Sequence, residues 1–179
     1  MTDNVFNFCP ECGSKNIQTK MNGRKWFCPE CNFDLYNNVA SAVGLVIQNS
    51  RDEILFEVRS KEPAKGMLAL PGGFSNADES AEESALRECV EETGVKPEHI
   101  KYLCSFPNNY EYRTIHYKTC DLFFSADFPE GFILKPQESE VESFVWKKVS
   151  SVEDVNKLPL AFESAVKALT VFVKNKFGE

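Results

Sequence analysis

Short apolar runs separated by polar, turn-forming residues extend over residues 41–149, a pattern typical of β-strands. The first two runs, 41–48 and 53–60, are joined by a turn at Arg51–Asp52 and predict a hairpin. The polar segment 62–66 predicts a loop. Three later strands are expected at residues 100–107, 116–128 and 143–149.

The segment 160–177 has the spacing of a helix instead. Its apolar residues recur every three or four positions and predict one buried stripe, made of Phe162, Val166, Leu169, Val173 and Phe177. A second helix is predicted after Ser80. Strands interleaved with two helices favour an α/β fold, in which a mixed sheet lies between helices.

The second helix carries clear end signals. Ser80 and Glu83 form a capping-box pattern, in which the serine hydroxyl satisfies a free amide of the first turn. Gly94 follows the last turn, where a left-handed residue is expected. The buried stripe of this helix is predicted to be Ala81, Ala85 and Cys89.

Three glutamates on this helix predict a metal site. Glu88, Glu91 and Glu92 stand at i, i+3 and i+4, so their carboxylates project from one face. Like charges repel, and a chain gains no stability from placing them together. A hard cation such as Mg²⁺ removes that penalty, because it takes carboxylate oxygens and keeps positions for water and substrate phosphates.

The segment 73–95 resembles the Nudix box, G-x5-E-x7-R-E-U-x-E-E-x-G-U, where U is a bulky aliphatic residue. The matching positions are Gly73, Glu79, Arg87, Glu88, Glu91, Glu92 and Gly94, with Val95 as the final aliphatic residue. Cys89 occupies the first aliphatic position, which suits a residue type that is often buried. The resemblance implies a Nudix α/β/α sandwich over residues 39–179.

The resemblance also implies roles for the box residues. Glu91 and Glu92 are expected to bind Mg²⁺ or Mn²⁺, with Glu88 as a third ligand or as a partner in activating water. Gly73 is expected to offer its carbonyl to a metal, and Gly72 to allow a ligand to approach closely. Arg87 is expected to point to another side of the helix and to hold Glu79 or a loop carbonyl.

Further candidates lie outside the box. Glu140, in the Ser139–Glu140 pair before a late strand, matches a position where many Nudix proteins have an additional ligand or general base. An exposed acidic loop is the alternative interpretation of that segment. Three aromatic residues are candidates for stacking on a nucleotide base: Phe74, Tyr110 and Tyr112.

Four cysteines near the N-terminus predict a second metal site. Cys9, Cys12, Cys28 and Cys31 form a C-x2-C-x15-C-x2-C pattern that resembles a zinc ribbon over residues 1–38. A closed four-thiolate site has no open position, so the zinc is expected to be structural. A rubredoxin-like iron site uses similar spacing and stays open as an alternative.

Composition limits the possible partners. The formal charge is 20 − 27 = −7, which argues against non-specific binding to nucleic acids or anionic membranes. No apolar run approaches the length of a membrane span, and the N-terminus lacks the features of a secretory signal. Seven cysteines without such a signal indicate a reducing cytoplasm. The resemblance implies a small nucleotide as the partner and a homodimer as the assembly.

The resemblance implies hydrolysis of a phosphoanhydride bond in a nucleoside diphosphate linked to another group. A zinc ribbon before a Nudix domain resembles the NADH pyrophosphatases, which carry S-Q-P-W-P-F-P-x-S after the box. Residues 105–110 read SFPNNY here, so only the serine and one proline match. ADP-ribose, nucleotide sugars, NADH and dinucleoside polyphosphates all stay open. The alternatives are a non-catalytic nucleotide-sensing module and an RNA-binding or decapping protein.

Overall fold

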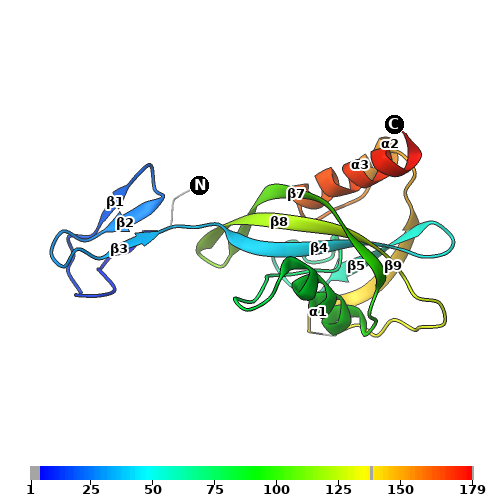
Figure 1. The fold of residues 1–179 in the computed structure, drawn as a ribbon, viewed down its shortest axis with the longest axis horizontal. Coiled ribbons are helices and arrows are strands. Elements are labelled where there is room, and N and C mark those ends of the chain that lie inside the picture. Colours follow the sequence, from blue (N-terminus) through cyan, green and yellow to red (C-terminus); the bar gives the residue numbers. More distant parts are fainter. Residues whose placement is uncertain (1–4, 138, 179) are drawn as a thin grey trace. The chain divides into compact units, whose positions relative to one another are not determined.

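The computed structural model describes residues 5–137 and 139–178, except for the side chain of Tyr112. The chain forms two compact units (Figure 1). The smaller unit contains the chain up to Ala40 together with Asn109–Lys118, and the larger unit contains Ser41–Asn108 and Thr119 onward. The described helices include none that is long and apolar enough to cross a membrane.

The smaller unit contains a three-stranded antiparallel sheet. Its strands, in spatial order, are β1 (Gln18–Lys20), β2 (Lys25–Phe27) and β3 (Asp34–Tyr36). Trp26 is the buried aromatic residue of β2, and its ring centroid lies 4.7 Å from that of Phe6. Two of the four predicted zinc ligands, Cys9 and Cys28, are also buried. A small sheet with four cysteines fits the predicted zinc ribbon.

A six-stranded sheet forms the centre of the larger unit. Five strands follow the spatial order β6-β5-β4-β8-β7, and β9 pairs with β5. Their bounds are β4 Ala40–Gln48, β5 Glu53–Arg59, β6 Leu68–Ala69, β7 Glu98–Tyr112, β8 Ile115–Asp127 and β9 Val141–Lys148. β5 is antiparallel to β4, β6 and β9, and a parallel bridge joins Leu68 to Leu160.

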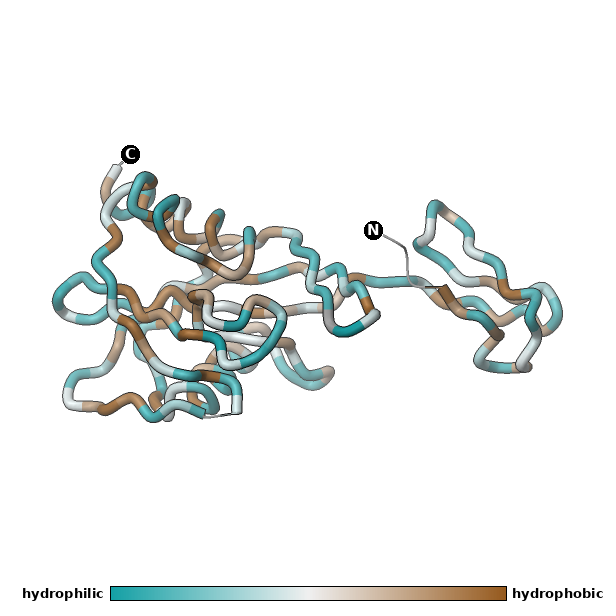
Figure 2. Tube along the Cα trace, turned by 180° about the vertical axis from the view of Figure 1, so that it is seen from behind, coloured by the Kyte–Doolittle hydropathy of each residue, from teal (hydrophilic) through white to brown (hydrophobic). Residues whose placement is uncertain are grey.

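Helices cover both faces of this sheet. α1 (Ala81–Thr93) lies on one side, and α2 (Val152–Asn156) and α3 (Glu163–Phe177) lie toward the other (Figure 1). Figure 2 shows hydrophobic segments along the central strands of this unit. The predicted α/β/α sandwich is therefore confirmed.

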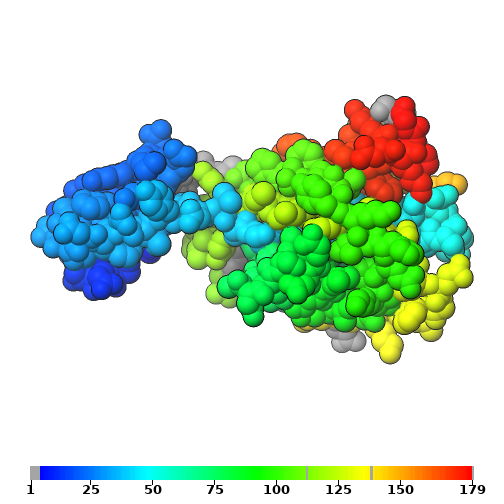
Figure 3. Space-filling view, in the orientation of Figure 1, coloured from blue at the N-terminus to red at the C-terminus, as the bar shows by residue number. Residues whose placement is uncertain are grey.

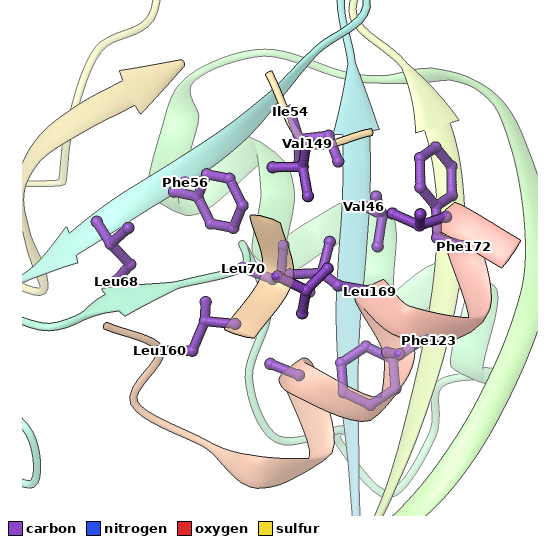
Figure 4. Close-up of a cluster of buried hydrophobic side chains, with 14 residues drawn as sticks. Val46, Ile54, Phe56, Leu68, Leu70, Phe123, Val149, Leu160, Leu169 and Phe172 are labelled. Atoms are coloured by element: carbon purple, nitrogen blue, oxygen red, sulfur yellow. The ribbon is translucent and has the colours of Figure 1, made fainter. Parts of the chain in front are cut away.

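The core on the α3 side combines alternate residues of three strands with the inner face of the helix. Val46 of β4, Phe56 of β5 and Phe123 of β8 are buried here with Leu169 and Phe172 of α3 (Figure 4). The apolar surface that these side chains remove from water is the main favourable contribution to folding.

The core on the α1 side uses the other residues of the same strands. Leu45 of β4, Leu55 of β5 and Phe124 of β8 are buried against Ala85 and Cys89 of α1. Because successive side chains of a strand point to opposite faces, β4 and β5 contribute to both cores. Both strands are therefore buried on two sides, which explains their nearly continuous apolar sequences.

The loop after β8 is held against the C-terminal end of α1. The amide of Lys135 donates to the carbonyl of Thr93 at 2.8 Å, and the amide of Gln137 donates to the carbonyl of Glu92 at 3.1 Å. These bonds satisfy carbonyls that the last turn of a helix leaves free. In Figure 3 this loop appears in yellow, in the larger unit.

The predicted elements correspond to observed ones with three differences. The strand expected at residues 100–107 extends from Glu98 to Tyr112, because it pairs with β8 in a long hairpin. The short elements β6 and α2 were not predicted. The expectation that Phe177 is buried is wrong: this residue is 43% exposed at the end of α3, whereas Phe172 is buried.

Candidate active site

The helix α1 presents the acidic residues of the candidate site. The Ser80 hydroxyl accepts a hydrogen bond from the Glu83 amide at 3.2 Å, and the Ser80 amide donates to the Glu83 carboxylate at 2.9 Å. This is the predicted capping box. Gly94 ends the helix in a left-handed conformation with φ 72°, as the sequence predicts. The helix ends are therefore fixed by local contacts.

The turn at Gly72–Gly73 brings backbone against two of the helix glutamates. The Gly72 amide donates to Oε2 of Glu92 at 2.8 Å. A Cβ atom on Gly73 would lie 2.8 Å from the carboxylate of Glu88. Gly72 itself has φ 147°, and a Cβ there would lie only 2.1 Å from the carbonyl oxygen of Val43. Only glycines allow this approach.

Arg87 connects the loop before the helix to the helix face. Its Nε and Nη2 donate to the two oxygens of Glu79 at 2.6 and 3.0 Å, and Nη2 also donates to the carbonyl of Phe74 at 3.1 Å. The predicted contacts of Arg87 with Glu79 and with a loop carbonyl are both confirmed. The paired guanidinium lowers the pKa of Glu79 to about 2.

Arg87 also contacts the glutamates that the sequence placed on another side of the helix. Its Nη1 donates to Glu88 at 2.8 Å and to Glu91 at 3.1 Å. The expectation that Arg87 points away from them is wrong, because residues four apart on a helix are neighbours. Part of the repulsion between these carboxylates is therefore offset within the chain.

The three helix glutamates differ in burial. Glu91 is exposed, Glu88 is partly buried and Glu92 has only 6% of its surface exposed. Burial raises the pKa of Glu88, and the charge of Arg87 opposes that rise. The pKa of Glu92 lies well above its usual range because of burial and because of the charge of Glu57.

Glu57 is a site residue that the sequence analysis missed. It lies on β5, is 4% exposed, and its carboxyl group contacts that of Glu92. Burial raises the pKa of Glu57 to about 8. One sequence signal was present: a charged residue interrupts the otherwise apolar stretch 54–58.

The three helix carboxylates do not converge on one point. Glu88 and Glu91 share Nη1 of Arg87, whereas Glu92 faces Gly72 and Glu57. The donor set nevertheless suits a hard cation, since all of its atoms are carboxylate oxygens. The neighbouring Glu57 of β5 adds a further carboxylate, and its Oε1 is buried and has no hydrogen-bond partner in the described part of the chain. This free oxygen and the close approach of Gly73 fit a bound divalent cation.

Two further predicted site residues, Gly73 and Glu140, have other partners within the chain. The carbonyl of Gly73 accepts a hydrogen bond from the Val43 amide at 2.8 Å, so one of its lone pairs is used in the sheet. Glu140 is exposed and pairs with Lys61 at 3.2 Å, and its charge contributes to the raised pKa of Glu88. It therefore lies within electrostatic reach of the helix glutamates.

Two of the three aromatic candidates, Phe74 and Tyr110, belong to different units. Phe74 is 40% exposed next to the Gly72–Gly73 turn. Tyr110 belongs to the smaller unit, and the side chain of Tyr112 lies outside the described residues. Their proposed stacking on a base stays a prediction.

The four N-terminal cysteines form a compact cluster. Their Sγ atoms all lie within 4.8 Å of one another, with Cys9 and Cys31 3.6 Å apart and Cys12 and Cys28 3.7 Å apart. Four sulfurs bound to zinc at the usual distance form a tetrahedron with edges of about 3.8 Å. The cluster therefore fits a tetrahedral zinc ion.

Comparisons with known proteins agree with this geometry. A family model described as NUDIX domain matches residues 39–169. The chain is 31% identical over 143 residues to the NAD-capped RNA hydrolase NudC of Pseudomonas aeruginosa (strain LESB58). That match covers 78% of this chain and 46% of that protein, so the chain spans about half the length of the curated relatives it matches.

Solved structures show the same fold. The NUDIX domain of Shewanella oneidensis NrtR complexed with ADP ribose is similar with a TM-score of 0.63 and 25% identity, covering 84% of this chain and 94% of that chain. A NUDIX hydrolase from Nitrosomonas europaea has a TM-score of 0.68 and 20% identity, covering 96% and 92%.

Proposed function

The chain belongs to the Nudix hydrolase family, and from this we propose that it hydrolyses a phosphoanhydride bond with Mg²⁺ or Mn²⁺ as cofactor. The substrate is a nucleoside diphosphate linked to a further group. The observation that supports this best is the contact of the Gly72–Gly73 turn with the buried Glu92 and the partly buried Glu88 of α1. There the Gly72 amide donates to the carboxylate of Glu92, and the backbone of Gly73 approaches the carboxylate of Glu88 so closely that a Cβ atom would collide with it.

Each residue has a distinct task in this proposal. Glu88, Glu91 and Glu92 supply oxygens to the divalent cation, which when bound offsets phosphate charge and lowers the pKa of a coordinated water. Arg87 positions the loop before the helix by binding Glu79 and the Phe74 carbonyl. Glu140 is proposed as a further ligand or general base, since its charge acts on Glu88.

Two similar proteins narrow the substrate class. NudC is named for NAD-capped RNA, and the NrtR domain was solved with ADP ribose. Both ligands contain an adenosine diphosphate group joined to ribose. We therefore place ADP-ribose and NADH ahead of nucleotide sugars and dinucleoside polyphosphates. The mismatch of residues 105–110 with the NADH pyrophosphatase signature favours ADP-ribose.

Hydrolysis of NAD-capped RNA is a second candidate, which the names of the relatives favour. It departs from the expectation that no nucleic acid binds. The net charge of −7 opposes binding of a long polynucleotide, because RNA-binding surfaces are usually basic. A nucleotide sensor without catalysis is less well supported, since every carboxylate of the box is present.

The test is hydrolysis of ADP-ribose, NADH, diadenosine tetraphosphate and NAD-capped RNA in Mg²⁺, with the phosphate products separated by chromatography. We expect turnover of ADP-ribose, and a loss of about 10²-fold or more in kcat for Glu92→Gln, because the amide would remove a carboxylate proposed to hold the divalent cation. Glu82→Gln changes an exposed glutamate of the same helix and should keep full activity.

The outcomes separate the candidates. Cleavage of only the capped RNA supports the second function, and binding of ADP-ribose without products supports a sensor. Unchanged kcat in Glu92→Gln, with metal still required, would contradict the metal-ligand role of Glu92.

We also propose a division into a structural zinc ribbon at residues 1–38 and a hydrolase domain at residues 39–179. The four cysteines, with sulfurs spaced as in a tetrahedral zinc site, support the first part. A homodimer is the assembly proposed for the family fold, and light scattering would test it.

A further inference from the structure

Glu57 is a buried carboxylate to which the Nudix box assigns no role. It lies two residues after Leu55 on β5, and alternate residues of a strand share a face. Leu55 packs in the core under α1, so Glu57 points toward the same helix. Only 4% of Glu57 is exposed. A charged side chain in this position is unfavourable unless it has a partner.

Among the described residues no basic side chain forms an ion pair with Glu57, although the charge of Arg59 acts on its carboxyl group. The guanidinium of Arg59 donates to the Pro63 carbonyl at 2.9 Å and lies 5.1 Å from the centroid of the Phe162 ring. Arg87 is engaged with Glu79, Glu88 and Glu91. No described residue makes a hydrogen bond to Oε1 of Glu57.

The neighbour that Glu57 does have is another buried carboxylate. Its carboxyl group lies within hydrogen-bonding reach of that of Glu92, a residue of α1 that is 6% exposed. The Gly72 amide holds Oε2 of Glu92 and so fixes the orientation of that group. Two buried carboxylates in contact, one with a free oxygen, are the ligands that a divalent cation takes: Mg²⁺ is typically held by one or two carboxylates, with water and substrate phosphates in the other positions.

We propose that Glu57 is a ligand of the divalent cation, binding it from the sheet side together with Glu92. This rests on the proposed hydrolase function for the identity of the cation, although its test does not require turnover. Because β5 is covered on both faces, Glu57 sits on a more rigid element than a loop ligand would. It fixes how deeply the cation sits between α1 and the sheet.

The test measures Mn²⁺ binding directly, by electron paramagnetic resonance and calorimetry, on the full chain loaded with one equivalent of Zn²⁺. We expect both Glu57→Gln and Glu92→Gln to weaken Mn²⁺ affinity on the order of 10–100-fold. Glu82→Gln is the matched control, since it removes one negative charge from the exposed surface of α1. Its Mn²⁺ affinity should equal that of the wild type.

A second variant separates a loss of metal binding from a loss of folding. Glu57→Val replaces the carboxylate with an apolar side chain suited to a buried strand, and circular dichroism reports the fold of each variant. Mn²⁺ should raise the Tm of the wild type and leave that of Glu57→Val nearly unchanged. In EDTA, Glu57→Val should unfold at a temperature no lower than the wild type, because two adjacent buried carboxylates are no longer forced together.

The results distinguish this inference from the proposed function. Wild-type Mn²⁺ affinity in both folded Glu57 variants would overturn the inference while the hydrolase function stands. Weakened binding in both variants, with no turnover of any substrate by the wild type, would support the ligand role and contradict the hydrolase function.

Discussion

Arg87 is the residue whose side chain links most of the candidate site. A guanidinium offers five donors in a fixed plane, and here they reach Glu79, Glu88, Glu91 and the carbonyl of Phe74. Lysine would provide a single point of charge and could not reproduce the paired bonds to Glu79. The loop before α1 is therefore held by an interaction that depends on side-chain geometry as well as charge.

The Glu79–Arg87 pair predicts a specific acid sensitivity. The pKa of Glu79 is about 2 in the folded chain and about 4.3 when unfolded. Its ionised form therefore stabilises the fold fully above about pH 5, and that contribution is lost as the pH falls toward 2. Glu79→Gln should be less stable at pH 6 and should lose less stability between pH 4 and 2 than the wild type.

Urea unfolding from pH 2 to 7 measures this difference, with Glu82→Gln as the control for removing a surface charge. Parallel stability curves for Glu79→Gln and the wild type would show that the pair does not stabilise the fold.

At this scale, the Nudix box could be predicted from sequence because its residues are defined by fixed spacing along one continuous segment, the loop before α1 and the helix itself. Glu57 could not. A charged residue in a hairpin strand is usually assigned to the solvent face, and only the cover of β5 by both helices makes that position buried. The direction of Arg87 follows from its neighbour four residues later, Glu91, which lies on the same side of the helix.

At the scale of elements, α1 was predictable from its ends. The Ser80–Glu83 capping box and Gly94 are local signals, and each acts within one turn of the helix. The long β7–β8 hairpin and the exposure of Phe177 depend on how far the sheet extends, which pairing between distant segments decides. The short β6 pairs with β5 and has no periodicity of its own in two residues.

The turn before α1 should tolerate no side chain at Gly72. An added Cβ would lie 2.1 Å from the Val43 carbonyl oxygen, at φ 147°, so Gly72→Ala requires a backbone shift. We expect a loss of about 3 kcal/mol or more in the free energy of unfolding. Gly131→Ala is the matched control: it has φ 80° with no atom within 4 Å, and should cost only about 1–2 kcal/mol.

Urea denaturation of both variants gives the comparison. Equal losses for Gly72→Ala and Gly131→Ala would mean that the contact with Val43 is relieved at little cost.

At the scale of the whole molecule, the two units have different sources of stability. The larger unit has two apolar cores, whereas the buried apolar residues described up to Ala40 are Cys9, Trp26 and Cys28. A segment of this size rarely folds on its apolar contacts alone. Zinc is therefore expected to supply most of the stability of the small sheet.

Cys12→Ser should remove zinc and unfold the small sheet. We expect amide hydrogens of β1, β2 and β3 to lose protection from exchange, while those of β4 and β5 keep it, because their hydrogen bonds belong to a separate core. Zinc content and hydrogen exchange measured by mass spectrometry provide the test. Cys104→Ser, outside the four-cysteine cluster, is the control and should retain one zinc.

Retained protection of β1–β3 in zinc-free Cys12→Ser would show that the metal is dispensable for that unit.

Arg87 forms ion pairs with Glu79, Glu88 and Glu91, and these pairs affect how the protein responds to removal of Mg²⁺. Because the guanidinium already pairs with these carboxylates, a sample freed of Mg²⁺ by dialysis, with its zinc retained, should lose activity while the larger unit stays folded. When Mg²⁺ is added back, the side chain of Arg87 has only to release Glu88 and Glu91 so that they can bind the ion. Side-chain rotations are fast, so activity should return within the time of mixing.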